Sequence, residues 1–215
     1  MVDPDLHLLP EYRGADVYWL YHDNYLAAKV LAETNPKLSR SIRTAIKSYG
    51  VAQSGKIEIL FGESPQGLPY KQYELTDVRR IGKKLIRTEV VKKDLLLGWE
   101  KYADLLFFAA MAEKDPHKAR AHFEAGMKMW SGLGFEDAVV KHHKQYATYK
   151  LALSLIAAKK LAISHPHKQP VVERLLALQG PVGGWITDYD LQAKPVGLAN
   201  VETTSLAILA LQTCL

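Results

Sequence analysis

Residues 15–50 read ADVYWLYHDNYLAAKVLAETNPKLSRSIRTAIKSYG, and their pattern decides the expected fold. The first half, up to Asn35-Pro36, is apolar on more than one face, which is typical of a helix buried inside a bundle. The second half spaces apolar residues at three- and four-residue steps between basic ones and stops at Gly50. This second pattern predicts an amphipathic helix at the surface.

The same alternation continues along the rest of the chain. An apolar stretch, 95–113, is followed by the amphipathic stretch 117–130, and the apolar 144–162 is followed by the amphipathic 169–179. A last apolar stretch, 202–215, ends the chain. Four buried helices that alternate with three amphipathic ones pack best as two concentric layers. We therefore expect a mainly all-α fold, an incomplete α/α toroid of about seven helices.

One region departs from the helical pattern. Residues 51–93 contain GKIEILFGE (55–63) and KKLIRTEVV (83–91), which both alternate apolar and polar residues and are separated by glycines and prolines. This pattern predicts a small β-ribbon inserted among the helices. A length of 215 residues fits a single domain, so we expect residues 1–215 to form one toroid domain that carries the ribbon.

Composition excludes several classes of protein. The chain has 28 Lys and Arg against 23 Asp and Glu, and this net charge of +5 is spread along the sequence, so we expect no nucleic-acid partner. No stretch approaches the roughly 18 apolar residues of a membrane span, and the first residues lack the pattern of a signal peptide. The chain as given is expected to be soluble and cytoplasmic, or secreted if a leader was removed.

Cofactor and metal motifs are also missing from the sequence. There is no Walker loop, dinucleotide fingerprint, nucleophile elbow or H-E-x-x-H pattern, and the single cysteine, Cys214, excludes an internal disulfide and a cysteine-based zinc cluster. The short-spaced pairs His142-His143 and His165/His167 have no third ligand nearby in sequence. We therefore expect no cofactor and no metal.

Polar and aromatic residues cluster where the buried helices begin, and in a two-layer arrangement these helix ends converge on one cavity. Aromatic rings stack on the apolar faces of sugars, while carboxyl groups bond hydroxyls or transfer protons. We predict Asp23, Asp104 and Asp188 as catalytic residues. The predicted ligand-binding residues are Trp19, His22, Asn24, Trp99, Tyr102, Tyr149, Lys150, Trp185, Tyr189 and Glu202.

Each candidate also has a structural interpretation. Asp23 could be a buried acid that is satisfied by a neighbour such as Lys150. Asp104 precedes six apolar residues, and a desolvated carboxyl group there suits either a general acid or a structural hydrogen bond. The segment around Asp188 could serve only to close a loop and cap the last helix, and Asp188 and Asp190 alone are too few for a calcium site.

The stretches YWLYHDNYLAAKVL (18–31), GWEKYADLL (98–106), GGWITDYD (183–190) and NVETTSLAILAL (200–211) resemble α/α-toroid proteins of the six-hairpin glycosidase-like group. The closing GGW and ETTSLAILAL are also similar to terpenoid cyclase, prenyltransferase and complement thioester toroids. The resemblance implies a toroid with a central cavity at one end and, in its glycosidase members, a carboxylate pair there. The cyclase Asp-rich motif, the prenyltransferase zinc ligands and the thioester Cys-Gly-Glu-Gln are absent.

The function expected from these observations is binding of a carbohydrate or glycan-like ligand, a small molecule or an oligosaccharide, in the central cavity. If the protein is an enzyme, we expect a glycoside hydrolase in which one carboxyl group protonates the leaving oxygen and another activates water or attacks the sugar. Two alternatives stay open. One is a non-catalytic module for protein interaction or self-assembly into a homo-oligomer, and the other is a carrier of a hydrophobic ligand.

Overall fold

The computed structural model describes residues 2–51, 56–63 and 70–212. Helices account for 49% of the structure and strands for 22%, and the strands form two small sheets. The fold is therefore a mixed α+β fold, and the prediction of an all-α toroid is wrong. Cys214 lies outside the described residues.

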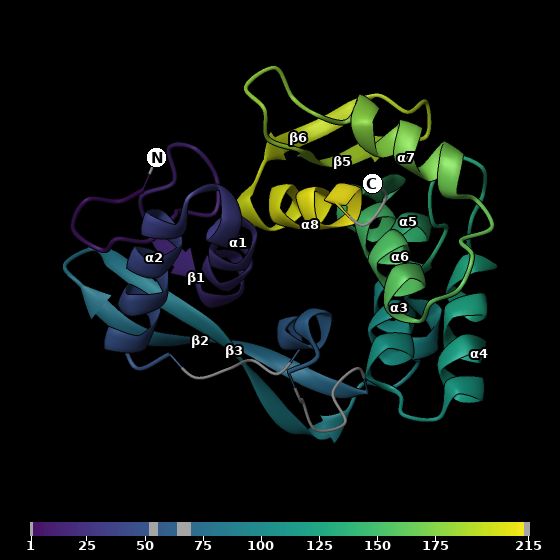
Figure 1. Ribbon diagram of the computed structural model, residues 1–215, viewed down its shortest axis with the longest axis horizontal. Helices are drawn as coiled ribbons and strands as arrows, with labels where there is room; N and C mark the ends of the chain where they lie inside the picture. The colour runs from purple at the N-terminus through teal and green to yellow at the C-terminus, as the bar shows by residue number, and fades with distance from the viewer. Residues whose placement is uncertain (1, 52–55, 64–69, 213–215) are drawn as a thin grey trace.

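Four helices supply most of the buried helical residues: α1 (Tyr21–Thr34), α3 (Ala103–Ala112), α6 (Thr148–Lys160) and α8 (Val201–Gln212). They follow one another along an arc in the order α1, α8, α6, α3, and each contacts the next (Figure 1). The helices that pack against this arc are α2 (Pro36–Ser48), α4 (Pro116–Met127) and α7 (Lys168–Ala177). A shorter helix, α5 (Ala138–His143), precedes α6.

The first sheet contains the inserted ribbon. Its strands are β1 (Tyr18–Leu20), β2 (Lys71–Ile81) and β3 (Lys84–Leu95), in the order β1-β3-β2. Strand β3 contains the predicted KKLIRTEVV segment and pairs antiparallel with β2 and parallel with β1. Residues 18–20, which we expected to belong to the first helix, form β1 instead, because Trp19 is buried opposite Ile86 of β3.

The prediction that residues 55–63 form the other strand of the ribbon is wrong. Most of GKIEILFGE forms a 3-10 helix, η1 (Ile57–Phe61), while residue 55 lies outside the described residues. Ile57 and Ile59 are both buried, and Glu58 between them accepts a hydrogen bond from the Tyr21 hydroxyl at 2.7 Å. Three consecutive buried side chains suit a tight turn packed in the interior better than a strand with one face in water.

A second sheet, which the sequence analysis missed, joins segments from the second half of the chain. Its strands are β4 (Gln145–Ala147), β5 (Ile186–Asp190) and β6 (Pro195–Ala199), paired antiparallel in that order. Such short strands carry little periodic signal, and β4 immediately precedes the apolar α6, so the sequence pattern merged the two.

Several helix starts agree with their sequence signals. The Asn35 side chain accepts the backbone N–H of Leu38 at the start of α2. Asp137 caps α5, and Asn200 accepts the N–H of Thr203 at 2.8 Å in α8. These side-chain acceptors satisfy N–H groups that have no partner inside the helix.

The arc of helices explains why a toroid does not form. In Figure 1 the β2-β3 ribbon and η1 lie on the concave side of the arc, where a ring would place further helices. η1 and η2 (Trp99–Lys101) both contact α3. Because of the two sheets, the chain does not have the toroid fold that the resemblance to six-hairpin glycosidase-like and related proteins implied.

Within the described residues, no helix combines the length and apolarity that crossing a bilayer requires.

Candidate functional site

A small cavity lies where the four buried helices face the ribbon and η1. Its volume is about 180 Å³, and we call it the central cavity. Side chains from α1, β3, α3, α6 and α8 meet there, together with the residues at the start of η1. The lining residues are His22, Lys56, Ile57, Glu89, Asp104, Phe108, Tyr149, Leu153, Glu202 and Leu206.

Asp23 lies beside this cavity in the first turn of α1 and is only 1% exposed. Neither of its carboxyl oxygens accepts a hydrogen bond from the described residues, and Nε2 of His22 is 3.3 Å from Oδ1. Burial raises the pKa of Asp23 well above its ordinary value of 3.8, and the charge of Glu202 raises it further. An acid in this state is costly to bury, because no hydrogen bond from the described residues replaces its lost hydration.

His22, Asp23 and Glu202 form a compact group, which we call the His-Asp-Glu cluster. One nitrogen or oxygen of each side chain lies within 4.8 Å of the others. The cluster exists because the first turns of α1 and α8 lie against each other, and α1 and α8 are adjacent in the arc. An imidazole and two carboxyl groups at this spacing can share a proton or bind a cation.

Lys56 and Glu89 add charge to another wall of the cavity. The Lys56 ammonium is 4.0 Å from a Glu89 carboxyl oxygen. Burial alone would lower the pKa of Lys56, but the carboxylates of Glu89, Asp104 and Glu202 outweigh this effect and raise it. Lys56 is therefore held as an ammonium by the acids around it.

The third charged wall comes from α3 and α6. The Tyr149 hydroxyl donates to Oδ2 of Asp104 at 3.1 Å, and the Lys150 ammonium is 3.7 Å from Oδ1 of the same carboxylate. Lys150, which is 2% exposed, also donates to Asp137, a second buried acid. Burial and the nearby charge of Asp104 raise the pKa of Tyr149 well above 10.0, so the phenol stays protonated.

The structure brings together only part of the predicted site. His22, Asp104, Tyr149 and Glu202 line the central cavity, and Asp23 lies against it in the His-Asp-Glu cluster. Lys150 does not line the cavity, and it pairs with Asp104 and Asp137 rather than with Asp23. Tyr102 lines a neighbouring hollow that Asp104 and Tyr149 also border.

The remaining predicted residues have other contacts. Asp188 lies on β5, opposite Ala147 of β4, and does not line the central cavity. Trp19 is 1% exposed, so its ring is packed in the core instead of presenting a face to a ligand. The Asn24 side chain bonds both the N–H and the carbonyl of Leu9, at 2.7 and 2.9 Å, and so anchors the N-terminal segment.

The other aromatic candidates are also held by the protein itself. Trp99 packs edge-on against Tyr70, with ring centroids 4.4 Å apart. The Trp185 ring N–H donates to the carbonyl of Leu175 at 2.8 Å, and the Tyr189 hydroxyl donates to the carbonyl of Leu133 at 3.0 Å. Trp19, Trp99, Trp185 and Tyr189 are absent from the central cavity's lining.

The sequence analysis missed three charged residues of the site region. Lys56 and Glu89 belong to the segment that was predicted to form the ribbon, and neither was named as a site residue. For Asp137 the sequence left open a rim loop or a helix start; it caps α5, and it also binds Lys150. Alternation within KKLIRTEVV places Glu89 on the same strand face as Arg87, and no sequence signal showed which face meets the helices.

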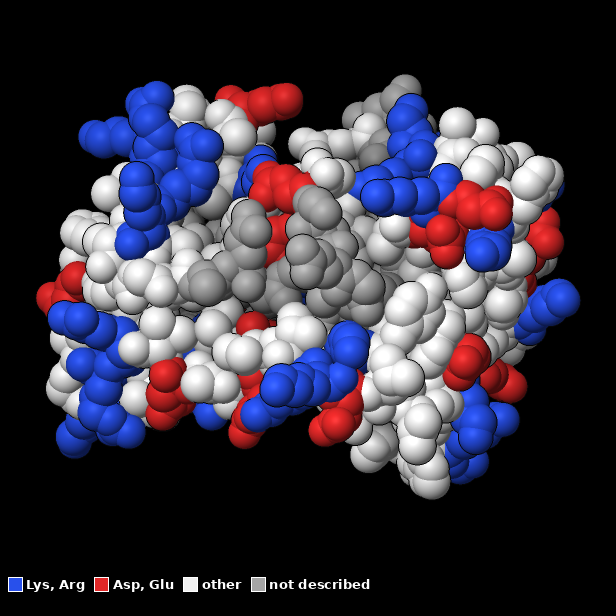
Figure 2. Space-filling model, turned by 90° about the horizontal axis from the view of Figure 1, so that it is seen from below, with Lys and Arg blue, Asp and Glu red and all other residues white. Residues whose placement is uncertain are grey.

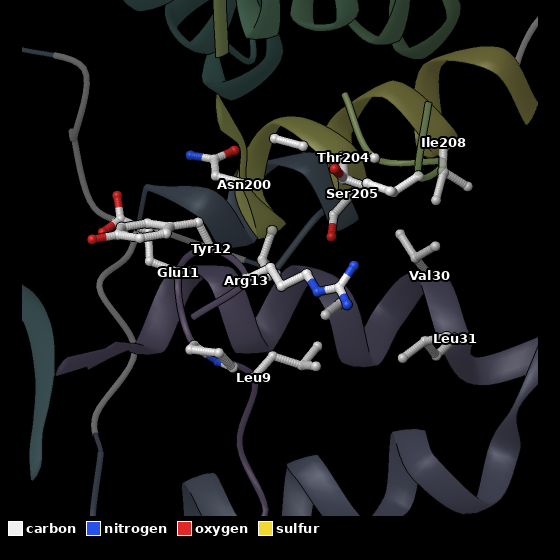
Figure 3. A pocket seen from close by; sticks show the side chains of 16 residues that line it. Leu9, Glu11, Tyr12, Arg13, Val30, Leu31, Asn200, Thr204, Ser205 and Ile208 are labelled. Atoms are coloured by element: carbon white, nitrogen blue, oxygen red, sulfur yellow. The ribbon is translucent and has the colours of Figure 1, made fainter. Parts of the chain in front are cut away.

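A second cavity lies between α1, α8 and the N-terminal segment, and its volume is about 440 Å³. Figure 3 shows Val30 and Leu31 of α1 and Ile208 of α8 around it, with the Arg13 side chain extending between the two helices. Most of its lining is aliphatic. This cavity, which we call the apolar cavity, differs in chemistry from the central one.

The face of the molecule in Figure 2 carries its basic side chains in separate groups. On the face shown in Figure 2, Lys and Arg form several patches, with Asp and Glu between them and near the middle of the face. A nucleic-acid interface would favour one continuous basic stripe. The charge on this face is instead mixed.

Comparison of the chain with protein-family models, with curated proteins and with solved structures gives no match. The interpretation of the site therefore depends on the geometry and chemistry of its own residues.

Proposed function

We propose that the protein binds a small ligand rich in hydroxyl or amine donors in the central cavity. The observation that carries this proposal is the convergence of three carboxylates, one lysine, one histidine and one tyrosine from six separate segments on a space of about 180 Å³. Gathering charged groups in a partly buried place costs desolvation free energy, and such groupings are characteristic of functional sites.

The balance of charge in the cavity selects the kind of ligand. Three acids line the cavity: Glu89, Asp104 and Glu202. Among the lining residues that the structure describes there is one lysine, Lys56. Ionised carboxylates only accept hydrogen bonds, so they suit ligand hydroxyl and ammonium groups. They repel an anionic ligand at close range. Phe108 and Leu206 supply apolar surface for the carbon skeleton of such a ligand.

A panel of small molecules tests the proposal. Monosaccharides, polyols, small diamines and small dicarboxylates are titrated by calorimetry in the presence of a chelator, which keeps metal ions out of the measurement. We expect binding of a neutral or cationic donor-rich member and no binding of dicarboxylates. Preference for the dicarboxylates, or no binding across the panel, would overturn the proposal.

Two variants locate the binding. Glu202→Gln keeps the shape of a cavity side chain but removes its charge, and it should weaken binding about tenfold, which corresponds to about 1.4 kcal/mol. Glu124→Gln makes the same change on the exposed face of α4 and should leave affinity unchanged. The sugar arm of the panel, followed by an assay of oligosaccharide cleavage with wild type and Asp104→Asn, also tests the carbohydrate and hydrolase predictions.

The apolar cavity favours a second candidate function, carriage of a hydrophobic ligand. Its volume of about 440 Å³ exceeds that of the central cavity, and Val30, Leu31 and Ile208 form aliphatic walls. Native mass spectrometry of the purified protein should then show a retained lipid-like molecule, which Ile208→Asp reduces by placing a charge in the wall. A ligand-free spectrum together with no binding of added fatty acids or alcohols would contradict this candidate.

A further inference from the structure

The His-Asp-Glu cluster has the composition of a metal site. His22 supplies an imidazole nitrogen, and Asp23 and Glu202 supply carboxyl oxygens, all within 4.8 Å of one another. Imidazole and carboxylate together are the ligands of zinc and of neighbouring transition metals, whereas calcium and magnesium prefer oxygen ligands alone. The set of donors therefore points to a transition-metal ion.

Asp23 gives a second and independent observation. It is 1% exposed, and neither of its oxygens has a hydrogen-bond partner among the described residues. Buried polar groups are normally satisfied, so an unsatisfied buried carboxyl group indicates a missing partner. The same is true of Nδ1 of His22, which is also buried without a partner in the described part of the chain.

The spacing inside the cluster agrees with shared coordination. Ligand atoms that lie about 2.0–2.2 Å from a tetrahedral Zn²⁺ are separated from each other by roughly 3.3–3.6 Å. Nε2 of His22 and Oδ1 of Asp23 are 3.3 Å apart, and they come from adjacent residues of one helix turn. Glu202 approaches both from the first turn of α8. The His22–Asp23 pair thus has the spacing of two ligands of one ion, and the Glu202 donor lies within 4.8 Å of both.

Electrostatics around Asp23 favour a cation. Beyond burial, the carboxylates of Glu202, Glu11 and Glu89 all act on Asp23 in the direction that disfavours its charge. A divalent cation between Asp23 and Glu202 converts this repulsion into attraction. It would also let Asp23 ionise without an uncompensated buried charge.

We propose that His22, Asp23 and Glu202 bind one divalent transition-metal ion of the zinc class at the wall of the central cavity. Three protein ligands leave a coordination position open, as in metal sites that bind a further ligand rather than in closed structural sites. His22 and Glu202 line the cavity, so the proposed ion would border the space where the small ligand is proposed to bind. The inference uses the same cavity as the proposed function but does not depend on the identity of the ligand.

The test uses metal alone. Chelator-treated protein is titrated with Zn²⁺ by calorimetry, and with Co²⁺ while its visible absorption is recorded. We expect one equivalent of each ion to bind and the Co²⁺ complex to show the bands of a low-coordinate site with nitrogen and oxygen ligands. Absence of stoichiometric binding would overturn the proposal.

Variants decide where the ion binds. Asp23→Asn and Glu202→Gln should each weaken Zn²⁺ binding at least about tenfold, because each removes a charged ligand. Glu33→Gln makes the same chemical change on the exposed face of α1 and should not alter affinity. Circular dichroism confirms that each variant is folded. Equal affinity in all four proteins would assign the metal to an adventitious surface position, such as His142-His143, and sink the proposal.

The metal inference and the proposed function fail separately. The small-molecule panel is measured in a chelator, and the Zn²⁺ titration is measured without any small molecule. A protein that binds the ligand but not Zn²⁺ keeps the proposed function and loses the metal site. A protein that binds Zn²⁺ alone, with loss in Asp23→Asn, keeps the metal site and loses the ligand.

Discussion

Asp23 and Asp137 are two acids with almost the same burial and opposite surroundings. They are 1% and 2% exposed. Asp137 binds the Lys150 ammonium and accepts the backbone N–H groups of Ala103 and Val139, at 3.2 and 2.9 Å. Asp23 accepts no hydrogen bond from the described residues. Burial alone therefore does not distinguish the two acids, whereas their hydrogen-bond partners do.

The difference between the two regions has an energetic meaning. A buried carboxylate with a cation and two backbone donors recovers much of its lost hydration, and it joins the start of α3 to α5 and α6. A buried carboxyl group without partners destabilises the fold unless it stays protonated or binds something. The region of Asp137 is thus built for stability, and the region of Asp23 is built at the expense of stability.

The largest expected effect concerns Asp137, the buried acid that has hydrogen-bond partners. Asp137→Ala should lower the free energy of unfolding by about 3–5 kcal/mol, because it leaves the Lys150 ammonium buried with Asp104 3.7 Å away as its remaining ion-pair partner. Urea unfolding followed by circular dichroism measures the change. The double variant Asp137→Leu with Lys150→Met removes both charges and should lose less. A loss below about 1 kcal/mol in Asp137→Ala would mean that the two acids are equivalent.

The next effect concerns Asn24, the immediate neighbour of Asp23. Asn24 is fully buried like Asp23, but its side chain bonds Leu9 twice and the Leu20 carbonyl once. Asn24→Ala should cost about 2–3 kcal/mol in urea unfolding, because it removes the hydrogen-bond partner of two partly buried Leu9 backbone groups and of the buried Leu20 carbonyl. It should also expose the N-terminal segment to limited proteolysis. An unchanged unfolding midpoint would show that the segment is held by its apolar contacts alone.

Asp23→Asn should change the stability in the opposite direction and stabilise the folded protein. Without metal, this variant should be more stable than wild type at pH 7, because the amide carries no charge to bury whereas the pKa of the wild-type acid is raised by burial. The pKa of Asp23 is raised in the folded protein, so the folded state retains its proton while the unfolded state loses it above 3.8. Wild-type stability due to this group therefore falls as the pH rises from 3.8 through the raised pKa.

The pH series provides the control for Asp23. The difference between Asp23→Asn and wild type should be small near pH 4 and widen toward neutral pH, when both are unfolded by urea in a chelator. A difference that stays constant with pH would contradict the unsatisfied acid and attribute the effect to packing. In a separate series without the chelator, added Zn²⁺ should narrow the difference in stability by stabilising wild type.

Local sequence signals predicted the parts of the fold that depend on neighbours in the chain. Asn35-Pro36 marks the start of α2, and Asn200 caps α8 where the polar cluster predicted a helix start. Strand β3 follows from the alternation in KKLIRTEVV. What failed was the assembly of these elements. Alternation of buried and amphipathic helices is compatible with an arc as well as with a ring, and the pairing of Trp19 with Ile86 of β3 is a long-range contact that no local pattern contains.

Local signals also explain why some of the candidate residues lie together in the structure. His22, Asp23, Asp104, Tyr149 and Glu202 sit near helix starts, and the packing of the helices brings these starts together. Four aromatic candidates, Trp19, Trp99, Trp185 and Tyr189, do not line the central cavity, because a tryptophan or tyrosine suits a buried structural contact as well as a ligand wall. Trp185, for instance, is fixed by its hydrogen bond to the Leu175 carbonyl.

The smallest expected effect concerns Tyr149, which lines the central cavity and donates a hydrogen bond to Asp104. It lies between the region of Asp23 and the region of Asp137. The phenol donates to Asp104 at 3.1 Å, while Lys150 lies 3.7 Å from the other oxygen of that carboxylate. Tyr149→Phe should cost about 1 kcal/mol in urea unfolding, because Asp104 keeps Lys150 and the cavity gives it access to water. If Asp104 depended on its partners as strongly as Asp137 does, Tyr149→Phe would lower the free energy of unfolding nearly as much as Asp137→Ala. A small loss in stability combined with weaker ligand binding would place Tyr149 on the functional side, since its hydroxyl then orients a carboxylate that the ligand contacts.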